Sequence, residues 1–225
     1  LANIMGMWVQ QECLREWASL GDVASGGGGR VDWPLLDAQT EAAQPARYLL
    51  DMSSPELMAP GGMVERVRSL WIPGPGAFPS SSSWDEAGAG VGDPRAGCVD
   101  PRERATVLRA ITDSLALAYR RAIRRTCKLS GTRPEAIHLV GGGSQNRLLA
   151  QETADATGIP TIAGPVEAAA VGNMLISLRA IGAASGTLTD LRAISRASSS
   201  LVTYEPRASH ARLWDEADAL LAARS

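Results

Sequence analysis

The sequence "VGGGSQN", residues 140–146, places three consecutive glycines after an apolar run and before the expected start of a helix. A glycine within a regular element costs about 0.5–1 kcal/mol relative to alanine, because it loses more backbone freedom on folding. Three in succession therefore indicate that another group approaches the main chain. Glycines let the backbone contact a flat base or a phosphate, and a helix that begins near Ser144 offers N–H donors to negative charge. We expect nucleotide binding, with the Asn146 amide placed to hydrogen-bond a base or a ribose.

The spacing around this turn leaves two interpretations open. Asn146 stands where the GxGxxG motif requires its last glycine, and no GxxxxGK[ST] phosphate loop occurs in the chain. The pattern therefore fits a tight structural turn as well as it fits a nucleotide site. The two histidines, His138 and His210, lie far from any cluster of metal ligands in the sequence, so we expect no structural zinc site.

The elements around the turn alternate between strand and helix, which predicts an α/β sheet. Each expected strand is a short apolar run bounded by proline or glycine, and each expected helix has apolar residues at helical spacing. The expected elements are, in chain order, a long helix from Pro101 to Gly131, a strand over 137–140, a helix from a Ser144 cap to Gly158, a strand over 160–165, and helices over 167–181 and 188–197.

The amino-terminal half is less regular. Residues 3–17, "NIMGMWVQQECLREW", have apolar residues at helical spacing, and Asn3 is a plausible cap for that helix. Residues 21–30 predict a flexible break. Residues 73–94 are rich in proline, glycine and serine, and predict a loose surface insertion because they bury too little apolar surface to offset ordering. Trp84, within this insertion, is either a loop anchor or a partner contact.

Composition and charge exclude several classes of protein. The chain has 225 residues, 45% of them hydrophobic, which is enough for a buried core. Its formal net charge is −2, so the electrostatics give no support for binding to nucleic acid. The 22 basic residues are scattered along the chain apart from one short cluster at the end of the long helix, where we predict a solvated face, with a partner site as the alternative. This cluster consists of Arg120, Arg121, Arg124 and Arg125.

Cysteine usage and hydropathy point to the cytoplasm. Cys13, Cys98 and Cys127 are odd in number, lie far apart and form no CxxC pair, as in a chain with reduced thiols. No stretch approaches the roughly 20 apolar residues of a membrane helix, and no signal segment opens the chain. We therefore expect a cytoplasmic protein without a membrane partner. The abrupt start, already inside a helical pattern, suggests that a region is missing upstream.

Two separated segments resemble the FGGY carbohydrate kinases. Residues 137–173, "IHLVGGGSQNRLLAQETADATGIPTIAGPVEAAAVGN", resemble the carboxyl lobe of this family and, within it, that of the rhamnulokinases. Residues 3–17 are similar to the segment that begins the same lobe. Residues 113–123 resemble the helix before the glycine strand, and residues 203–206 resemble the tail. The segments follow the order of the family, which is far more specific than a triple glycine.

The resemblance implies an actin-like, ribonuclease-H-like ATPase fold, in which an α/β lobe has a mixed sheet flanked by helices. Residues 1–225 would form the carboxyl-terminal lobe, with the amino-terminal lobe absent. In that family the glycine turn holds the nucleotide. This role is carried over to Gly141, Gly142 and Gly143, with Gly142 the best single candidate and Asn146 a lesser one.

The resemblance also assigns roles to the opening helix. Asn3 falls on the sugar-contacting asparagine of the family, and Gln11 falls on its ATP-contacting glutamine. Eight residues of helix advance about 12 Å, so one helix would extend from the sugar to the phosphates. A simple cap at Asn3 and an exposed amide at Gln11 are the alternatives. Glu167, Gly164 and Gly172 match the family pattern too, and we expect all three to serve packing.

By resemblance, the function is that of an ATP- and Mg²⁺-dependent kinase acting on a ketose, most like the conversion of L-rhamnulose to L-rhamnulose 1-phosphate. The catalytic base of the family is an aspartate in the amino-terminal lobe. No residue here matches it, so we assign no catalytic residue and no metal ligand, and we expect the isolated chain to be nearly inactive. The alternatives are a non-catalytic nucleotide-binding remnant and an interaction module built on the actin-like fold.

Overall fold

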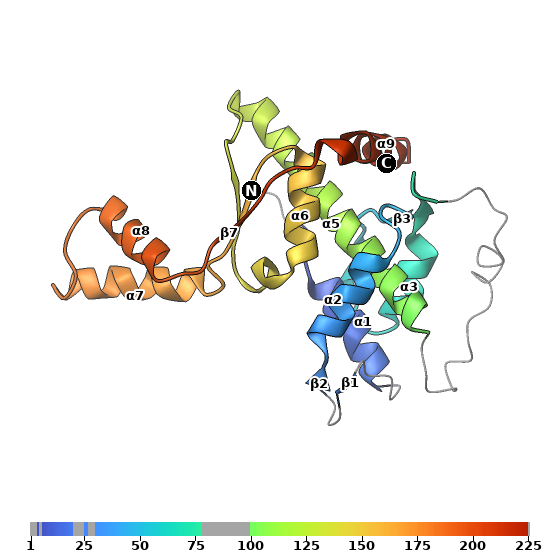
Figure 1. The fold of residues 1–225 in the computed structure, drawn as a ribbon, viewed down its shortest axis with the longest axis horizontal. Coiled ribbons are helices and arrows are strands. Elements are labelled where there is room, and N and C mark those ends of the chain that lie inside the picture. The colour runs from blue at the N-terminus through green and yellow to red at the C-terminus, as the bar shows by residue number, and fades with distance from the viewer. Residues whose placement is uncertain (1–3, 5, 20–24, 27–29, 78–99, 225) are drawn as a thin grey trace.

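The structure is a computed structural model, and it describes residues 4, 6–19, 25–26, 30–77 and 100–224. A body of helices surrounds the long helix α5, a small sheet lies beside α6, and the hairpin of α7 and α8 projects away from both (Figure 1). Among the described residues, no helix combines the length and the apolar character needed to cross a bilayer.

The elements follow in chain order. The helices are α1 Trp8–Ser19, α2 Trp33–Ala42, α3 Met63–Leu70, α5 Pro101–Ser130, α6 Arg147–Thr157, α7 Ala168–Ala180, α8 Leu188–Ala197 and α9 Ala211–Ala222, with the 3₁₀ turns η1 Pro55–Met58, η4 Gly142–Gln145 and η5 Ala208–His210. The strands are β1 Ser25–Gly26, β2 Arg30–Val31, β3 Tyr48–Leu49, β4 Ile72–Pro73, β5 Ile137–Leu139, β6 Thr161–Ala163 and β7 Val202–Tyr204.

The sheet beside α6 is mixed. Its strand order is β5-β6-β7, with β5 parallel to β6 and β7 antiparallel to β6. The helix α6 contacts β6 and β7, and the β6 residues Thr161 and Ala163 are buried on the face that it covers. The predicted α/β arrangement, a mixed sheet with helices beside it, is confirmed.

The long helix α5 has clear signals at both ends. Asp100 caps its start, where the carboxylate accepts the N–H of Arg102 at 2.8 Å, and Pro101 occupies the first turn. Gly131 ends the helix in the left-handed conformation, with φ of 67°. The predicted bounds of this helix are confirmed.

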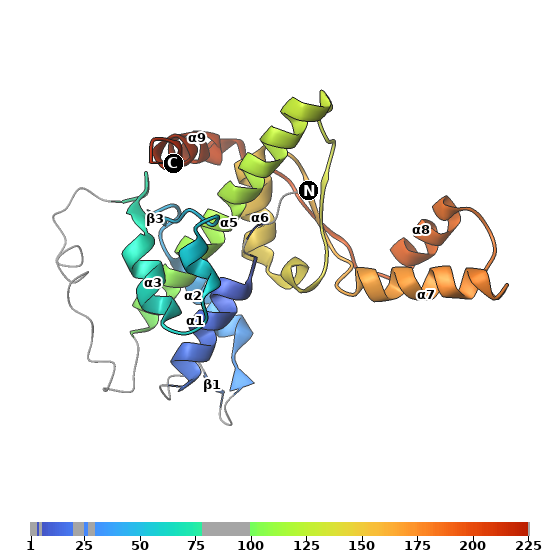
Figure 2. The same cartoon turned by 180° about the vertical axis from the view of Figure 1, so that it is seen from behind.

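The main apolar core forms around α5. The helices α1, α2 and α3 pack against it (Figure 2). Two polar contacts fix the loop before and after β3 on the same helix: the Asp113 carboxylate accepts the N–H of Ala46 at 2.7 Å, and the Ser114 hydroxyl accepts that of Leu50 at 2.8 Å. The core includes Val9, Cys13, Trp17, Leu36, Met63, Val67, Leu108, Ile111, Leu115 and Leu149.

A second core forms where α9 packs on α5. Trp214 is fully buried there, together with Ala217 and Leu221, against Leu117 of α5. A tryptophan side chain buries a large apolar area, so this contact anchors the carboxyl-terminal helix.

The basic cluster of α5 binds α9. Arg120, only 4% exposed, pairs with Asp215 and Asp218. Arg121 donates from Nε to Asp218 at 2.7 Å, and Arg124 donates to the same carboxylate at 2.8 Å. The prediction of a solvated face is therefore wrong for Arg120, because this side chain is buried and pairs with two aspartates of the last helix, the exposed Asp215 and the half-buried Asp218.

The opening helix differs from its prediction. It begins at Trp8, and the first bond into it runs from the N–H of Gln11 to the carbonyl of Met7 at 3.0 Å. The described residues 4, 6 and 7 are not helical, so the prediction of one helix from Asn3 to Gln11 is wrong. Asn3 itself, the predicted cap, lies outside the described residues.

The start of the predicted insertion is packed. Gly74 and Gly76 donate their N–H groups to the carbonyls of Arg47 and Ala46, at 2.9 and 3.0 Å. A side chain at either glycine would collide with the backbone of the Pro45–Ala46 loop. Residues 78–99, which include Trp84, lie outside the described residues, as do the glycines at 27–29 of the predicted flexible break.

Buried charges join α5 to α6. The Arg109 Nε donates to both carboxylate oxygens of Asp113, at 2.9 and 3.0 Å. Its Nη2 donates to Glu152 of α6 at 2.7 Å. All three side chains are at most about a twentieth exposed, so the contact is both buried and fully specific in its geometry.

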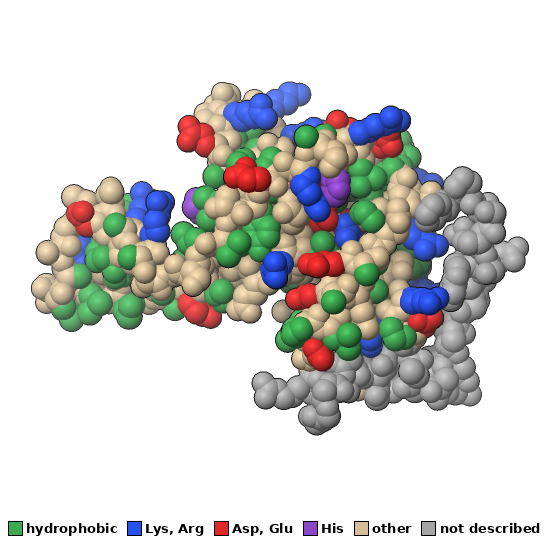
Figure 3. Space-filling view, viewed as in Figure 1, with side chains coloured by type: hydrophobic (Ala, Val, Ile, Leu, Met, Phe, Trp, Pro, Cys, Tyr) green, Lys and Arg blue, Asp and Glu red, His purple; other side chains and the backbone are tan. Residues whose placement is uncertain are grey.

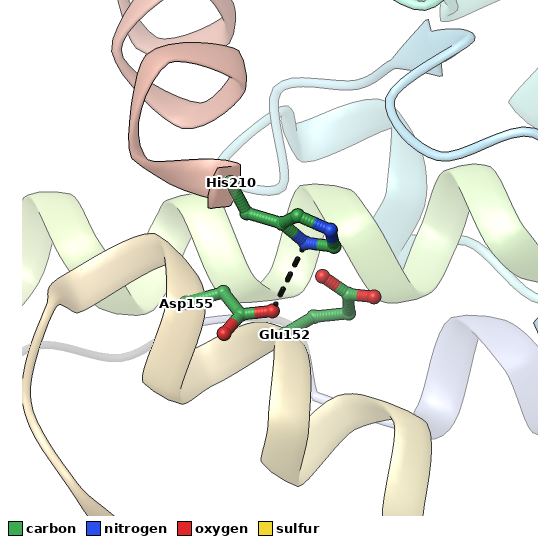
Figure 4. Close-up of side chains that lie close together, drawn as sticks. All are labelled: Glu152, Asp155 and His210. Atoms are coloured by element: carbon green, nitrogen blue, oxygen red, sulfur yellow. Dashed lines mark ion pairs between the residues drawn. The ribbon is translucent and has the colours of Figure 1, made fainter. Parts of the chain in front are cut away.

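The segment before α9 joins the same network. Arg207 donates from Nε to Asp155 at 2.7 Å and from Nη2 to Glu152 at 3.3 Å. His210 places its Nδ1 3.2 Å from the Asp155 carboxylate, and it faces the two carboxylates of α6 (Figure 4). The network therefore holds three segments together: α5, α6 and the carboxyl-terminal tail.

The network contains more carboxylates than guanidinium groups. Asp113, Glu152 and Asp155 face only Arg109 and Arg207, with His210 at the edge. Burial, reinforced by the neighbouring Asp113 carboxylate, raises the pKa of Glu152 to about 7, against the opposing pull of the two guanidinium groups. Burial also raises the pKa of Asp113. The folded chain thus retains a proton that the unfolded chain releases near pH 4.5.

The tryptophan in the second core gives a test of the fold. We expect Trp214→Ala to lower the free energy of unfolding by about 3–5 kcal/mol, because it leaves a large cavity between α5 and α9. Trp33→Ala, at a half-exposed tryptophan in the first turn of α2, should cost less than about 1 kcal/mol. Urea denaturation followed by circular dichroism measures both. Equal losses in the two variants would contradict the assignment of Trp214 as an anchor.

The proton on Glu152 predicts a pH dependence of stability. A raised pKa in the folded state favours folding below pH 4.5, and this contribution is lost as pH rises to about 7. Relative to Glu152→Gln, which mimics the protonated carboxyl, the wild-type chain should lose about 1–3 kcal/mol between pH 5 and 7.5.

Urea denaturation at each pH measures this difference. Glu216→Gln, at an exposed glutamate that pairs with Arg212 on the surface, is the matched control and should show no such trend. The predicted sign of the pH dependence would be wrong if the free energy of unfolding of the wild-type chain increased relative to that of Glu152→Gln as pH rises.

Candidate nucleotide site

The glycine turn follows β5 and leads into α6. Gly141 has φ of 79° and ψ of −166°, a conformation that is essentially restricted to glycine. Its N–H donates to the carbonyl of Pro165 at 3.1 Å, and the N–H of Gly164 donates to the carbonyl of Leu139 at 2.9 Å. These two bonds tie the turn to the end of β6. The backbone conformation of the turn therefore requires glycine at position 141, independently of any ligand.

The outer side of the turn is open. A side chain added at Gly141 or Gly142 would meet no atom within 4 Å among the described residues. The N–H groups of Gly142 and Gly143 have no hydrogen-bond partner in the described part of the chain. An exposed bend with unpaired N–H groups next to a helix start is the arrangement that binds anions. The described side chains thus leave the turn unfilled.

The sequence indicated Ser144 as the cap of α6. This prediction is wrong, because the cap is Asn146. The Asn146 Oδ1 accepts the N–H of Leu149 at 2.8 Å, while the Ser144 hydroxyl donates to the carbonyl of Gly141 at 2.7 Å. Ser144 itself lies within the 3₁₀ turn η4, so the true helix starts at Arg147, two residues later than a Ser144 cap would place it. Capping occupies the Asn146 oxygen and leaves its NH₂ group for a ligand.

The start of α1 lies beside the turn. The Met7 Cγ is 3.9 Å from the position of a Cβ at Gly143. Gln11 lies one helical turn further along and is exposed. The structure therefore places the helix that carries Gln11 next to the three glycines. Its neighbour Gln10 is buried, with a side-chain oxygen that lacks a partner among the described residues.

The other positions that match the family pattern, Gly164, Gly172 and Glu167, have different surroundings. A side chain at Gly164 would lie 2.8 Å from the Ser200 carbonyl oxygen, so close packing explains this glycine, as predicted. Gly172 is exposed, and nothing among the described residues lies within 4 Å of its added Cβ. Glu167 is exposed at the start of α7 and makes no capping hydrogen bond there. The predicted packing role of Gly172 and Glu167 stays a prediction, because no described residue packs closely against either of them.

One cluster has the residue types of a metal centre. Glu152, Asp155 and His210 bring ligand atoms within 4.8 Å of one another, and the second Glu152 oxygen has no hydrogen-bond partner (Figure 4). Arg109 and Arg207 already pair with these carboxylates, so a divalent cation would be repelled by two adjacent guanidinium groups. We assign the cluster to the structural network and not to a metal site.

Sequence reasoning missed this network. Arg109, Asp113, Glu152 and Asp155 lie on two helices whose contact cannot be read from one sequence. The spacing offered a partial signal, because Arg109 and Asp113 are four apart and so lie on the same helical face. Charged residues on the apolar face of a predicted helix indicate a buried ion pair.

Comparisons with known proteins agree on one family. The sequence profile of the FGGY family of carbohydrate kinases, C-terminal domain, matches residues 1–181. The chain is 33% identical over 217 residues to a rhamnulokinase of Bacteroides thetaiotaomicron, covering 96% of this chain and 37% of that protein. It is 31% identical over 206 residues to a rhamnulokinase of Klebsiella pneumoniae, covering 92% and 35%. The chain thus spans little more than a third of the length of these curated relatives.

A solved structure supports the fold. The xylulose kinase of Rhodospirillum rubrum superposes with a TM-score of 0.55 at 17% identity, covering 93% of this chain and 37% of that one. The actin-like ATPase fold expected from the sequence is confirmed by this likeness. Since the profile extends from the opening segment through α7, the chain belongs to the FGGY family of carbohydrate kinases and carries its C-terminal domain.

Proposed function

We propose that the chain is the nucleotide-side lobe of an ATP-dependent sugar kinase that converts L-rhamnulose to L-rhamnulose 1-phosphate. The rhamnulokinases among its relatives support this choice of sugar. Residues 1–225 form one lobe, with the insertion at 73–94, and the reaction requires an amino-terminal lobe, either joined to it or separate. The reduced cysteines Cys13 and Cys127 fit a cytoplasmic location.

The open glycine turn is the observation that supports nucleotide binding most directly. The main chain of Gly141, Gly142 and Gly143 would lie against the nucleotide, with the unpaired N–H groups donating to it. The Asn146 NH₂ and the exposed Gln11 side chain would donate from the two flanking helices. Asn3, outside the described residues, would contact the sugar.

Phosphoryl transfer would then depend on positioning. ATP supplies the phosphoryl group, and Mg²⁺ neutralises its charge. This chain orients the nucleotide through a turn that α6 holds rigidly, while the base that accepts the hydroxyl proton comes from the other lobe. Apart from the Glu152 cluster, the described residues contain no group of three metal-ligating side chains. The phosphates and the amino-terminal lobe would therefore hold Mg²⁺.

Calorimetric titration tests the nucleotide site. We expect Mg-ATP to bind the wild-type chain and Gly142→Asp to abolish the binding heat, because the added carboxylate repels phosphate at the turn. The Gly142 site has room for a side chain, so the variant should keep its fold. Gly158→Asn, at a left-handed helix end that asparagine tolerates, is the control and should bind normally. Equal heats from wild type and Gly142→Asp would remove the nucleotide from this turn.

An activity assay tests the requirement for a second lobe. The purified 225-residue chain, given ATP, Mg²⁺ and L-rhamnulose, should produce sugar phosphate no faster than buffer, because no residue supplies the base. The Bacteroides thetaiotaomicron rhamnulokinase serves as the positive control in the same assay. Turnover by the isolated chain at a rate comparable to the control would show that the base lies within these 225 residues.

A further inference from the structure

A cavity lies where the long helix α5 ends beside the end of α6. It has a volume of about 360 Å³ and is bounded by the last turns of α5, the loop that leads to β5 and the end of α6. Pockets for small ligands begin at about 300 Å³, so the cavity can hold a molecule of the size of a monosaccharide. It is separate from the candidate nucleotide site, because the glycine turn lies at the opposite end of α6, about 16 Å away along that helix.

The walls of the cavity are basic and apolar. Arg120, Arg124 and Arg133 line it, and none of its described lining residues is acidic. Lys and Arg side chains also gather over this end of α5 in Figure 3. Two aliphatic side chains, Ile123 and Ile159, form part of the same lining. The cavity therefore suits a ligand that has an anionic group and a carbon skeleton.

The three arginines differ in what already binds them. Arg120 is 4% exposed, and its Nη1 donates at 2.7 Å to a carbonyl in the last turn of α6, so the fold itself explains this side chain. Both Arg120 and Arg124 form ion pairs with Asp215 and Asp218 of α9. The exposed Arg133 side chain makes no hydrogen bond or ion pair with any described residue. Its guanidinium group is thus available to a ligand.

The charges at this end of α5 do not balance. Two aspartates, Asp215 and Asp218, supply all the ion-pair partners that the guanidinium groups here have among the described residues. Four arginines against two aspartates leave two positive charges without a described counter-charge. A phosphate monoester carries about −1.5 to −2 near pH 7, and its oxygens match planar guanidinium groups, so it fits this excess better than one carboxylate does. The four arginines are Arg120, Arg121, Arg124 and Arg133.

We propose that this cavity binds a small organic phosphate, at a second ligand site distinct from the nucleotide turn. The exposed guanidinium groups of Arg124 and Arg133 would donate to the phosphate, and the carbon skeleton would pack on Ile123 and Ile159. A bound ligand would also cover Cys127, a half-buried free cysteine that lines the cavity. The proposal goes beyond the proposed function and does not depend on it, because it requires neither a second lobe nor ATP.

Protection of Cys127 from alkylation tests the site without using activity. The full 225-residue chain is treated with N-ethylmaleimide at constant ionic strength, and mass spectrometry of the peptides reads Cys127 separately from the other cysteines. Fructose 1-phosphate is the probe. Its binding should slow labelling of Cys127 saturably, by about tenfold at a concentration of about ten times its Kd.

Two simpler probes separate the parts of the ligand. Inorganic phosphate should need a concentration at least about fivefold higher for the same protection, because it lacks the carbon skeleton that the apolar lining contacts. Fructose, which lacks the phosphate, should give no protection.

Arg133→Glu should weaken protection by fructose 1-phosphate at least about tenfold, because it places a negative charge beside the phosphate. Arg133→Gln, which removes the charge without reversing it, should weaken protection at least about threefold. Circular dichroism checks that both variants fold. Arg179→Glu is the matched control, since Arg179 is an exposed arginine in the last turn of α7 whose side chain also has no described partner. It should protect as the wild type does, because the hairpin of α7 and α8 projects away from α5 (Figure 1).

Three results would overturn the proposal. The first is labelling of Cys127 that fructose 1-phosphate does not slow. The second is protection that is as strong in folded Arg133→Glu as in the wild-type chain. The third is equal protection by inorganic phosphate and fructose 1-phosphate, or protection by fructose alone, which would show that the cavity does not select an organic phosphate.

Discussion

The contact between α5 and α6 determines where the glycine turn of the candidate site lies. Leu149 places α6 in the main core, and Arg109 bonds Glu152 across the interface at 2.7 Å. Because α6 starts at the glycine turn, its fixed position holds the turn at the end of β5 and beside the start of α1. Removing one member of a buried charge network leaves its partner as an uncompensated buried charge, which is destabilising. The network therefore fixes the relative position of α5 and α6 and also contributes to the stability of their contact.

Local signals were sufficient to predict much of the regular structure. The Asp100 cap and the Gly131 terminator define α5 without any tertiary information, and the strand–turn–helix around residues 137–157 follows from apolar runs broken by glycine. The error at the α6 cap arose because serine and asparagine both cap helices, and Ser144 lies in the 3₁₀ turn η4, two residues before the true cap Asn146. The late start of α1 had no such local signal.

Tertiary contacts explain what the sequence could not reveal. Arg120 was expected on a solvated face, but it is buried and pairs with Asp215 and Asp218 of α9, some 95 residues later in the chain. The predicted roles of Gln11 and the glycines remain proposals, although the structure brings the helix and the turn together. Gly172 shows the converse limit: it matches the family pattern, yet no described residue lies within 4 Å of a side chain added there.

Backbone NMR of the ¹⁵N-labelled chain during titration with Mg-ADP tests the central claim most directly. Binding at the open turn predicts saturable shifts of the Gly141, Gly142 and Gly143 amides, with smaller shifts at Asn146 and Gln11 and none in α8. Saturable shifts confined to other residues, with the three glycine amides unmoved, would show that the nucleotide binds elsewhere and that the turn is structural only.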